Sequence, residues 1–133
     1  MTQPIIDDSN FPIVNFVMPE QIKDTETEQH IAAWQAILDK QQPYVLIFSG
    51  VELPKNSAAF FREYKKWNKR TRSQQEKYCC GAVRVETDEA KRKSLWRKAF
   101  RYLTSSAIPY PYRVVATQQE AQSQATSWLK QNE

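Results

Sequence analysis

The sequence predicts a single α/β domain over residues 1–133, with a mainly parallel sheet of four strands and about four helices. Strand-like and helix-like patterns alternate along the chain without a detectable repeat. The segment 44–48 (YVLIF) is apolar or aromatic throughout, as in a strand covered by helices on both faces. Residues 1–10 form a flexible end or a short extra strand, and the extra strand would make the sheet five-stranded and mixed.

The first third of the chain contains two strands and a helix between them. Residues 11–18 (FPIVNFVM) are apolar and β-branched, as in a buried strand. A helix from Thr25 to about Gln41 has acids in its first turn, where they face the positive end of the helix dipole. This helix ends before Pro43, and the strand 44–48 follows.

The middle of the chain is expected to form a long helix and a third strand. The helix spans about residues 57–78, is capped by Asn56 or Ser57, and ends before Gly81. Residues 82–86 (AVRVE) alternate between apolar and polar side chains, which is typical of a more exposed strand.

The last third of the chain adds a helix, a strand and a final helix. The helix over residues 88–104 begins at Asp88, and the strand 113–116 follows a Pro-rich segment. Thr117 and Glu120 have the spacing of a capping box. The final helix is expected to bury Ala121, Ala125, Trp128 and Leu129.

The Pro-rich segment 108–112 (IPYPY) has two interpretations. Tyr110 and Tyr112 form either an aromatic pocket or a rigid turn, and the peptide bonds before the prolines at 109 and 111 are either cis or trans.

Composition argues against most enzyme classes. The two glycines, Gly50 and Gly81, stand alone, so no Gly-rich loop is present to bind phosphate. His30 is the single histidine, and we expect it to be a packed or solvated helix residue rather than a catalytic base. The adjacent Cys79 and Cys80 cannot easily chelate one ion, which favours a packing role. We expect no metal, no cofactor and no enzymatic activity.

The charge is concentrated in the middle of the chain. Residues 55–101 hold fifteen of the nineteen Lys and Arg and five of the fifteen acids, a net of +10, whereas the rest of the chain sums to −6. The intervening aromatic residues are expected to face the sheet, and they are Phe60, Phe61, Tyr64, Trp67, Trp96 and Phe100. The outward basic surface consists of Arg62, Lys65, Lys66, Lys69, Arg70, Arg97, Lys98 and Arg101. This surface is either simply solvated or binds nucleic acid or an anionic membrane surface.

The loops at the carboxyl ends of the strands are the expected binding region, because ligands of parallel sheets usually bind there. These loops cover about residues 19–25, 49–57, 86–89 and 117–119. The candidate binding residues follow the strongest strand, where a helix N-terminus favours an anion. They are Ser49, Gly50, Lys55, Asn56 and Ser57. Helix capping is the alternative role of Asn56 and Ser57.

Several strings within residues 11–130 resemble the SpoIIAA-like domains of the STAS superfamily, the fold of bacterial anti-anti-sigma factors. They are the segment 44–53 (YVLIFSGVEL), the segment 80–85 (CGAVRV), and the segment 113–117 (RVVAT) before a helix that ends in ATSWL. The resemblance implies a small stand-alone module that regulates or binds rather than catalyses. Its expected partner is a protein or a small ligand, and a homodimer is an open alternative.

The resemblance also implies a candidate modification site. In anti-anti-sigma factors an Asp-Ser-Ser-Gly motif follows the central strand, and a partner kinase phosphorylates its serine. The corresponding stretch here is Lys55-Asn56-Ser57-Ala58, so the motif is degenerate and Ser57 is the remaining candidate phosphoacceptor.

We expect the protein to be cytoplasmic. No apolar run approaches the roughly 20 residues of a membrane helix. The N-terminal segment carries acids where a signal peptide carries cations.

Overall fold

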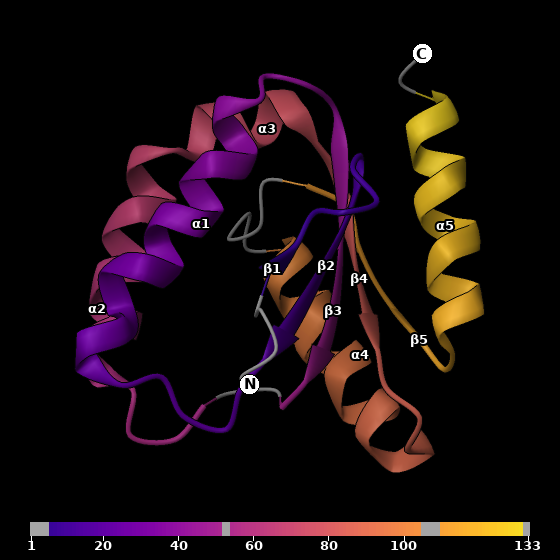
Figure 1. Ribbon diagram of the computed structural model, residues 1–133. Helices are drawn as coiled ribbons and strands as arrows, with labels where there is room; N and C mark the ends of the chain where they lie inside the picture. Colours follow the sequence, from indigo (N-terminus) through magenta and orange to yellow (C-terminus); the bar gives the residue numbers. More distant parts are fainter. Residues whose placement is uncertain (1–5, 52–53, 105–109, 132–133) are drawn as a thin grey trace.

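The computed structural model describes residues 6–51, 54–104 and 110–131, with the backbone alone for residues 96 and 98–104. These residues form one α/β unit with a five-stranded mixed sheet and five helices (Figure 1). The expected fold class is confirmed, and the short N-terminal strand is present.

The strands lie in the sheet in the same order as in the chain. They are β1 (Ile6–Asp7), β2 (Ile13–Met18), β3 (Tyr44–Gly50), β4 (Cys79–Val85) and β5 (Tyr112–Val115). β1 is antiparallel to β2, and the other neighbours are parallel. Successive right-handed crossovers in one direction place the connecting helices on one side of the sheet.

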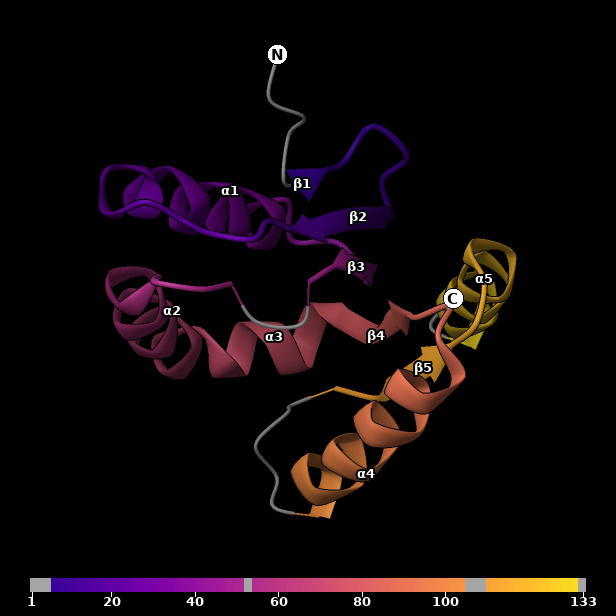
Figure 2. The same ribbon diagram turned by 90° about the horizontal axis from the view of Figure 1, so that it is seen from below.

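Helices cover both sides of this sheet (Figures 1 and 2). The 3-10 turn η1 (Asp24–Glu26) leads into α1 (Thr27–Asp39). This helix, α2 (Ala58–Arg70) and α3 (Arg72–Tyr78) lie on one side, which we call the α1 face. α5 (Gln118–Gln131) covers β3 and β4 on the opposite side, the α5 face, and α4 (Glu89–Thr104) packs against the edge strand β5.

The core on the α1 face is aromatic. Trp34 lies at its centre, with ring centroids 4.8 Å from Phe16, 6.0 Å from Phe48 and 6.0 Å from Trp67. Tyr44 and the aliphatic side chains of Val14 and Leu46 complete the cluster. Tilted and edge-on ring pairs of this kind stabilise a core beyond their buried area.

The core on the α5 face is built from smaller aliphatic side chains. Val45, Ile47 and Val83 are at most 1% exposed and pack against Ala121 and Ala125 of α5. The alanines let the helix approach the sheet closely.

Gly81 also faces α5. A Cβ atom added there would overlap the ring of Trp128, so the glycine makes room for that indole. The burial of Ala121, Ala125, Trp128 and Leu129 expected from the sequence is therefore observed, fully for the alanines and in part for the other two.

Two helix starts form as expected. The Asp88 carboxylate accepts a hydrogen bond from Lys91 N at 2.9 Å and caps α4. At α5, Thr117 Oγ1 accepts from Glu120 N at 3.1 Å, while Glu120 Oε2 accepts from Ala116 N at 3.1 Å. The capping box is confirmed, with one difference from the standard motif. The Glu120 carboxylate binds the N–H of Ala116, the residue before the N-cap, instead of the N–H of the N-cap residue itself.

The expected helix 57–78 is not continuous, because it breaks at Thr71 into α2 and α3. The Thr71 hydroxyl donates to Trp67 O at 2.8 Å and accepts from Gln75 Nε2 at 2.9 Å. A threonine that bonds back to its own helix competes with the regular ladder.

Two expectations about exposure were wrong. Residues 82–84 are buried because β4 lies between β3 and β5, whereas the alternation predicted a more exposed strand. Phe61 is 37% exposed and contacts Phe60 at the surface, so it does not face the sheet. Phe60, Tyr64 and Trp67 face the core as expected, and the side chains of Trp96 and Phe100 lie outside the described residues.

The Pro-rich segment before β5 supplies core residues. Tyr110 and Tyr112 pack against the aromatic cluster of the α1 face. The bond before Pro111 is trans, Pro109 lies outside the described residues, and the cis X-Pro bond of the described chain is Phe11–Pro12.

Candidate functional site

The carboxyl ends of the parallel strands form one edge of the sheet, as expected. β2, β3, β4 and β5 end at Met18, Gly50, Val85 and Val115. The candidate binding residues fall at two places along this edge. Ser49 and Gly50 end β3, and Lys55 to Ser57 precede α2.

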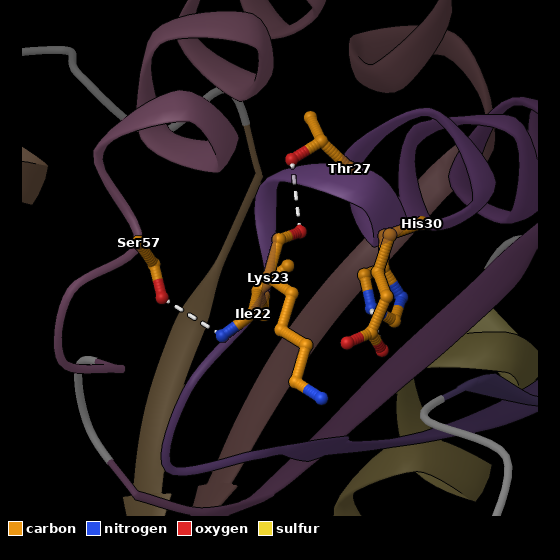
Figure 3. A network of polar contacts seen from close by, with 6 residues as sticks. Ile22, Lys23, Thr27, His30 and Ser57 are labelled. Carbon is orange, nitrogen blue, oxygen red and sulfur yellow. Dashed lines mark hydrogen bonds and ion pairs between the residues drawn. The ribbon is translucent and has the colours of Figure 1, made fainter.

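The segment before α2 is hydrogen-bonded to the loop that follows β2. Lys55 N donates to Glu20 O at 2.6 Å, and Ile22 N donates to Ser57 Oγ at 2.8 Å (Figure 3). The Ser57 hydroxyl donates in turn to Lys55 O at 2.9 Å. We call residues 20–22 and 55–57 the loop pair. These bonds join two loops that are far apart in the sequence into one surface.

The loop pair presents an exposed tip between buried ends. Lys55 and Asn56 are exposed, whereas Pro54 and Ser57 are buried. Asn56 has φ 51°, in the left-handed region that asparagine tolerates better than most residues. The hydrogen bonds at Lys55 and Ser57 therefore fix the backbone of this tip.

Ser57 has a structural role in the folded chain. It occupies the N-cap position of α2, but its side chain makes no capping bond to the helix and bonds to Ile22 instead. Ser57 is 2% exposed, and its hydroxyl is used both as donor and as acceptor. Phosphorylation of Ser57 stays a prediction, and a kinase would reach the hydroxyl only after the loop pair separates.

The first turns of α1 lie beside the loop pair. Thr27 Oγ1 donates to Lys23 O at 3.5 Å (Figure 3). The His30 ring packs 6.2 Å from that of Phe60. His30 Nε2 makes no hydrogen bond and lies 3.9 Å from a carboxylate oxygen of Glu26. Burial lowers the pKa of His30, and the Glu26 charge offsets part of this effect. His30 is thus the packed helix residue that was expected.

Gly50 joins the other end of the candidate segment to β4. Its φ of 86° is in the left-handed region, and a Cβ atom there would overlap the backbone of Met18. The Gly50 carbonyl accepts a hydrogen bond from the Arg84 guanidinium, and the Val51 carbonyl accepts a second at 3.4 Å.

Arg84 is the residue of this edge that the sequence interpretation missed. It is 6% exposed, and its Nε atom has no hydrogen-bond partner. Alternation in AVRVE suggested a solvated side chain. The missing information was the tertiary arrangement, since β4 lies between β3 and β5 in a sheet whose two faces are covered by helices.

The predicted basic surface is partly neutralised. Glu63 lies among its cations, with carboxylate distances of 3.9 Å to Arg62 and 3.5 Å to Lys66. The other described members are exposed and form no ion pair, and they are Lys65, Lys69, Arg70 and Arg97. The side chains of Lys98 and Arg101 lie outside the described residues.

Open hollows of the described surface lie away from the loop pair. One of about 320 Å³ lies between α1 and α2 and includes Gln35, Trp67 and Arg70. Another of about 760 Å³ lies along β5 and α5. Burial raises the pKa values of Tyr64 and Cys79 to about 12, and neither residue lines these hollows.

The two cysteines are free thiols at the start of β4. Cys79 is buried, directly after α3, which matches the expected packing role. Within the described chain, no group of three His, Cys, Asp or Glu residues gathers in a way that could hold a metal ion. None of the helices described here has the length and apolar character needed to cross a membrane.

Comparisons with protein-family models, curated proteins and solved structures find no match to this chain. The described fold is an α/β fold whose mixed sheet has its strands in the order of the chain. The resemblance to STAS domains stays a prediction from the sequence.

Proposed function

We propose that the protein is a non-enzymatic, regulatory binding module that recognises a protein partner through the loop pair. The observation that carries this proposal is the exposed tip of Lys55 and Asn56 between two buried anchors. Because hydrogen bonds hold its backbone before binding, the tip loses little backbone entropy when a partner docks.

The position of the loop pair supports the same proposal. It lies at the carboxyl edge of the parallel strands, where α/β proteins usually bind their ligands. The resemblance to STAS domains points to the same segment, since their regulatory serine motif follows the central strand. In this protein, Ser57 fixes the loop and Lys55 is free to contact an acidic group on the partner.

Affinity capture from the native cell, at two salt concentrations, tests the proposal. The full chain is compared with Lys55→Glu and with Lys130→Glu, the same charge reversal on the exposed side of α5. We expect a partner whose recovery falls several-fold with Lys55→Glu and is unchanged with Lys130→Glu. Equal recovery by both variants would contradict a role of the loop pair.

A second candidate function is binding of nucleic acid or an anionic membrane surface by the outer side of α2. Lys65, Lys69 and Arg70 are exposed and have no ion pair. Phe61 is exposed on the same helix, so an aromatic ring accompanies the cations.

Retention on heparin at increasing salt tests this second function. A triple change to glutamate at positions 65, 69 and 70 should abolish retention, while Lys130→Glu leaves it unchanged. Binding of the wild type should weaken steeply with salt, because counterion release dominates such complexes. No retention of the wild type at low salt rules this function out.

A further inference from the structure

Arg84 places a positive charge inside the protein. The residue is 6% exposed, and no carboxylate of the described residues forms an ion pair with it. Its acceptors are two backbone carbonyls, those of Gly50 and Val51. A buried charge is costly unless it is paired, and carbonyl dipoles compensate it less well than an anion does.

The guanidinium keeps unused hydrogen-bond donors on one side. Nη1 donates to Val51 O and Nη2 to Gly50 O, whereas Nε has no partner. No further hydrogen bond joins the guanidinium to a described residue. Nε–H and a neighbouring terminal N–H form the fork that binds two oxygens of one carboxylate or phosphate.

The surroundings of Arg84 are apolar and aromatic. Its pairing partners in the sheet are Phe48 of β3 and Val114 of β5, so these side chains point to the same face. Phe48 is only half-buried and packs against Trp34. A ligand that reaches Arg84 would therefore contact an aromatic surface beside the charge.

Unsatisfied polar atoms concentrate on this face. In the described part of the chain, the buried side-chain nitrogens without a hydrogen-bond partner are His30 Nε2, Trp34 Nε1 and Arg84 Nε. His30 and Trp34 are one turn apart on α1, and all three residues belong to the α1 face. Native proteins satisfy most such groups with protein, water or ligand partners.

A second arginine, eight residues after Arg84, also binds backbone carbonyls. Arg92 donates to Glu86 O and Thr87 O, both at 3.0 Å. The Glu86 carboxylate, on the same strand end, accepts from Asp88 N at 3.4 Å and forms no ion pair with Arg84. Both arginines therefore bind carbonyls rather than acids.

We propose that Arg84 is the anchor of a binding site for a small organic anion at the carboxyl ends of β3 and β4. The ligand carries a carboxylate or phosphate group, which takes the free fork of Arg84, and an apolar or aromatic part, which packs against Phe48. This proposal goes beyond the proposed function and does not rest on it, because no residue of the loop pair takes part.

Thermal unfolding of the full chain with phenyl phosphate, phenylacetate and inorganic phosphate tests the site. Sodium chloride keeps the ionic strength constant. We expect a saturable rise in Tm with at least one phenyl anion, and a weaker effect of inorganic phosphate, which lacks the apolar part. The stronger of the two phenyl anions identifies the preferred headgroup.

Two arginine variants provide the matched comparison. Arg84→Gln should weaken the apparent affinity at least about tenfold, as expected on losing a charge-assisted fork. Arg97→Gln, an exposed arginine of α4, should leave it unchanged. Equal affinities for both variants, or no saturable rise in the wild type, would overturn the proposal and leave Arg84 as a clamp on the end of β3.

A spectroscopic measurement keeps the test independent of the folding of Arg84→Gln. In ¹⁵N-labelled wild-type protein, the Nε–H resonance of Arg84 should shift with the same anion and saturate at the same concentration. A resonance that stays in place with all three anions overturns the proposal even if the variant does not fold.

Discussion

The two faces of the sheet differ in chemistry although they share the same strands. The α5 face is aliphatic and closely packed, with Ala121 and Ala125 against Val45, Ile47 and Val83. The α1 face is aromatic and contains the buried polar side chains of the described chain. These are Thr27, His30, Ser57, Thr71, Gln75 and Arg84.

We infer that the two faces have different roles, stability of the fold for the α5 face and the proposed ligand binding for the α1 face. Small aliphatic side chains have no polar atoms and can contact a ligand only through apolar surface. The α5 face is therefore a structural core. Buried polar groups cost free energy unless they are satisfied. On the α1 face, the unsatisfied ones are the side-chain nitrogens of His30, Trp34 and Arg84 among the described residues.

Removal of the central indole should have the largest effect. Trp34→Ala deletes the ring that contacts Phe16, Phe48 and Trp67 and should cost about 3–5 kcal/mol of unfolding free energy. Ile47→Val on the α5 face should cost about 0.5–1.5 kcal/mol. Urea unfolding measures both values, and similar costs would show that the aromatic cluster is not the main core.

A larger side chain at position 81, on the α5 face, should destabilise the protein. Gly81→Ala forces the Trp128 ring to move and should cost about 1–3 kcal/mol. The double variant Gly81→Ala with Trp128→Leu should cost less than the sum of the two single changes, because the smaller side chain removes the overlap. Additive costs in urea unfolding would contradict this contact.

Loss of the Ser57 hydroxyl should leave Ile22 N without its acceptor. Ser57→Ala should therefore cost about 1–3 kcal/mol, and Ser57→Asp should cost more because it buries a carboxylate. The control is Thr126→Ala, which removes a hydroxyl bond on the exposed side of α5 and should change stability by about 0.5 kcal/mol or less. If Ser57→Asp is as stable as the wild type, the loop pair is open in solution.

His30 should make stability depend on pH. Because burial lowers its pKa below the usual 6.5, the unfolded chain binds a proton at a higher pH than the folded chain does. The free energy of unfolding should fall as the pH drops through about 6.5, until the pH passes the folded pKa. His30→Phe should remove this part of the pH dependence. Identical pH profiles of the unfolding midpoint would show that His30 titrates normally in the folded state.

Much of the fold could be predicted from local patterns. The apolar run 44–48 identified an inner strand, and Asp88 and Thr117 marked the starts of two helices. These signals depend on neighbouring residues and on helix-end chemistry, so they are visible without the tertiary structure. The break at Thr71 was missed because a back-bonding threonine looks the same in the sequence as one that faces solvent.

The candidate site was predictable only in part. The segment after β3 was found because it follows the strongest strand. The role of Ser57 could not be predicted, since its partner Ile22 is 35 residues away. Arg84 was missed for a related reason, because its burial depends on which strands flank β4.

The sequential order of the strands has a consequence for biosynthesis. Each strand pairs with the one made just before it, so the sheet can extend as the chain leaves the ribosome. The α5 face is different, because its cover, α5, is made after all five strands. Until α5 docks, Val45, Ile47 and Val83 stay open to water, and this face is exposed to aggregation.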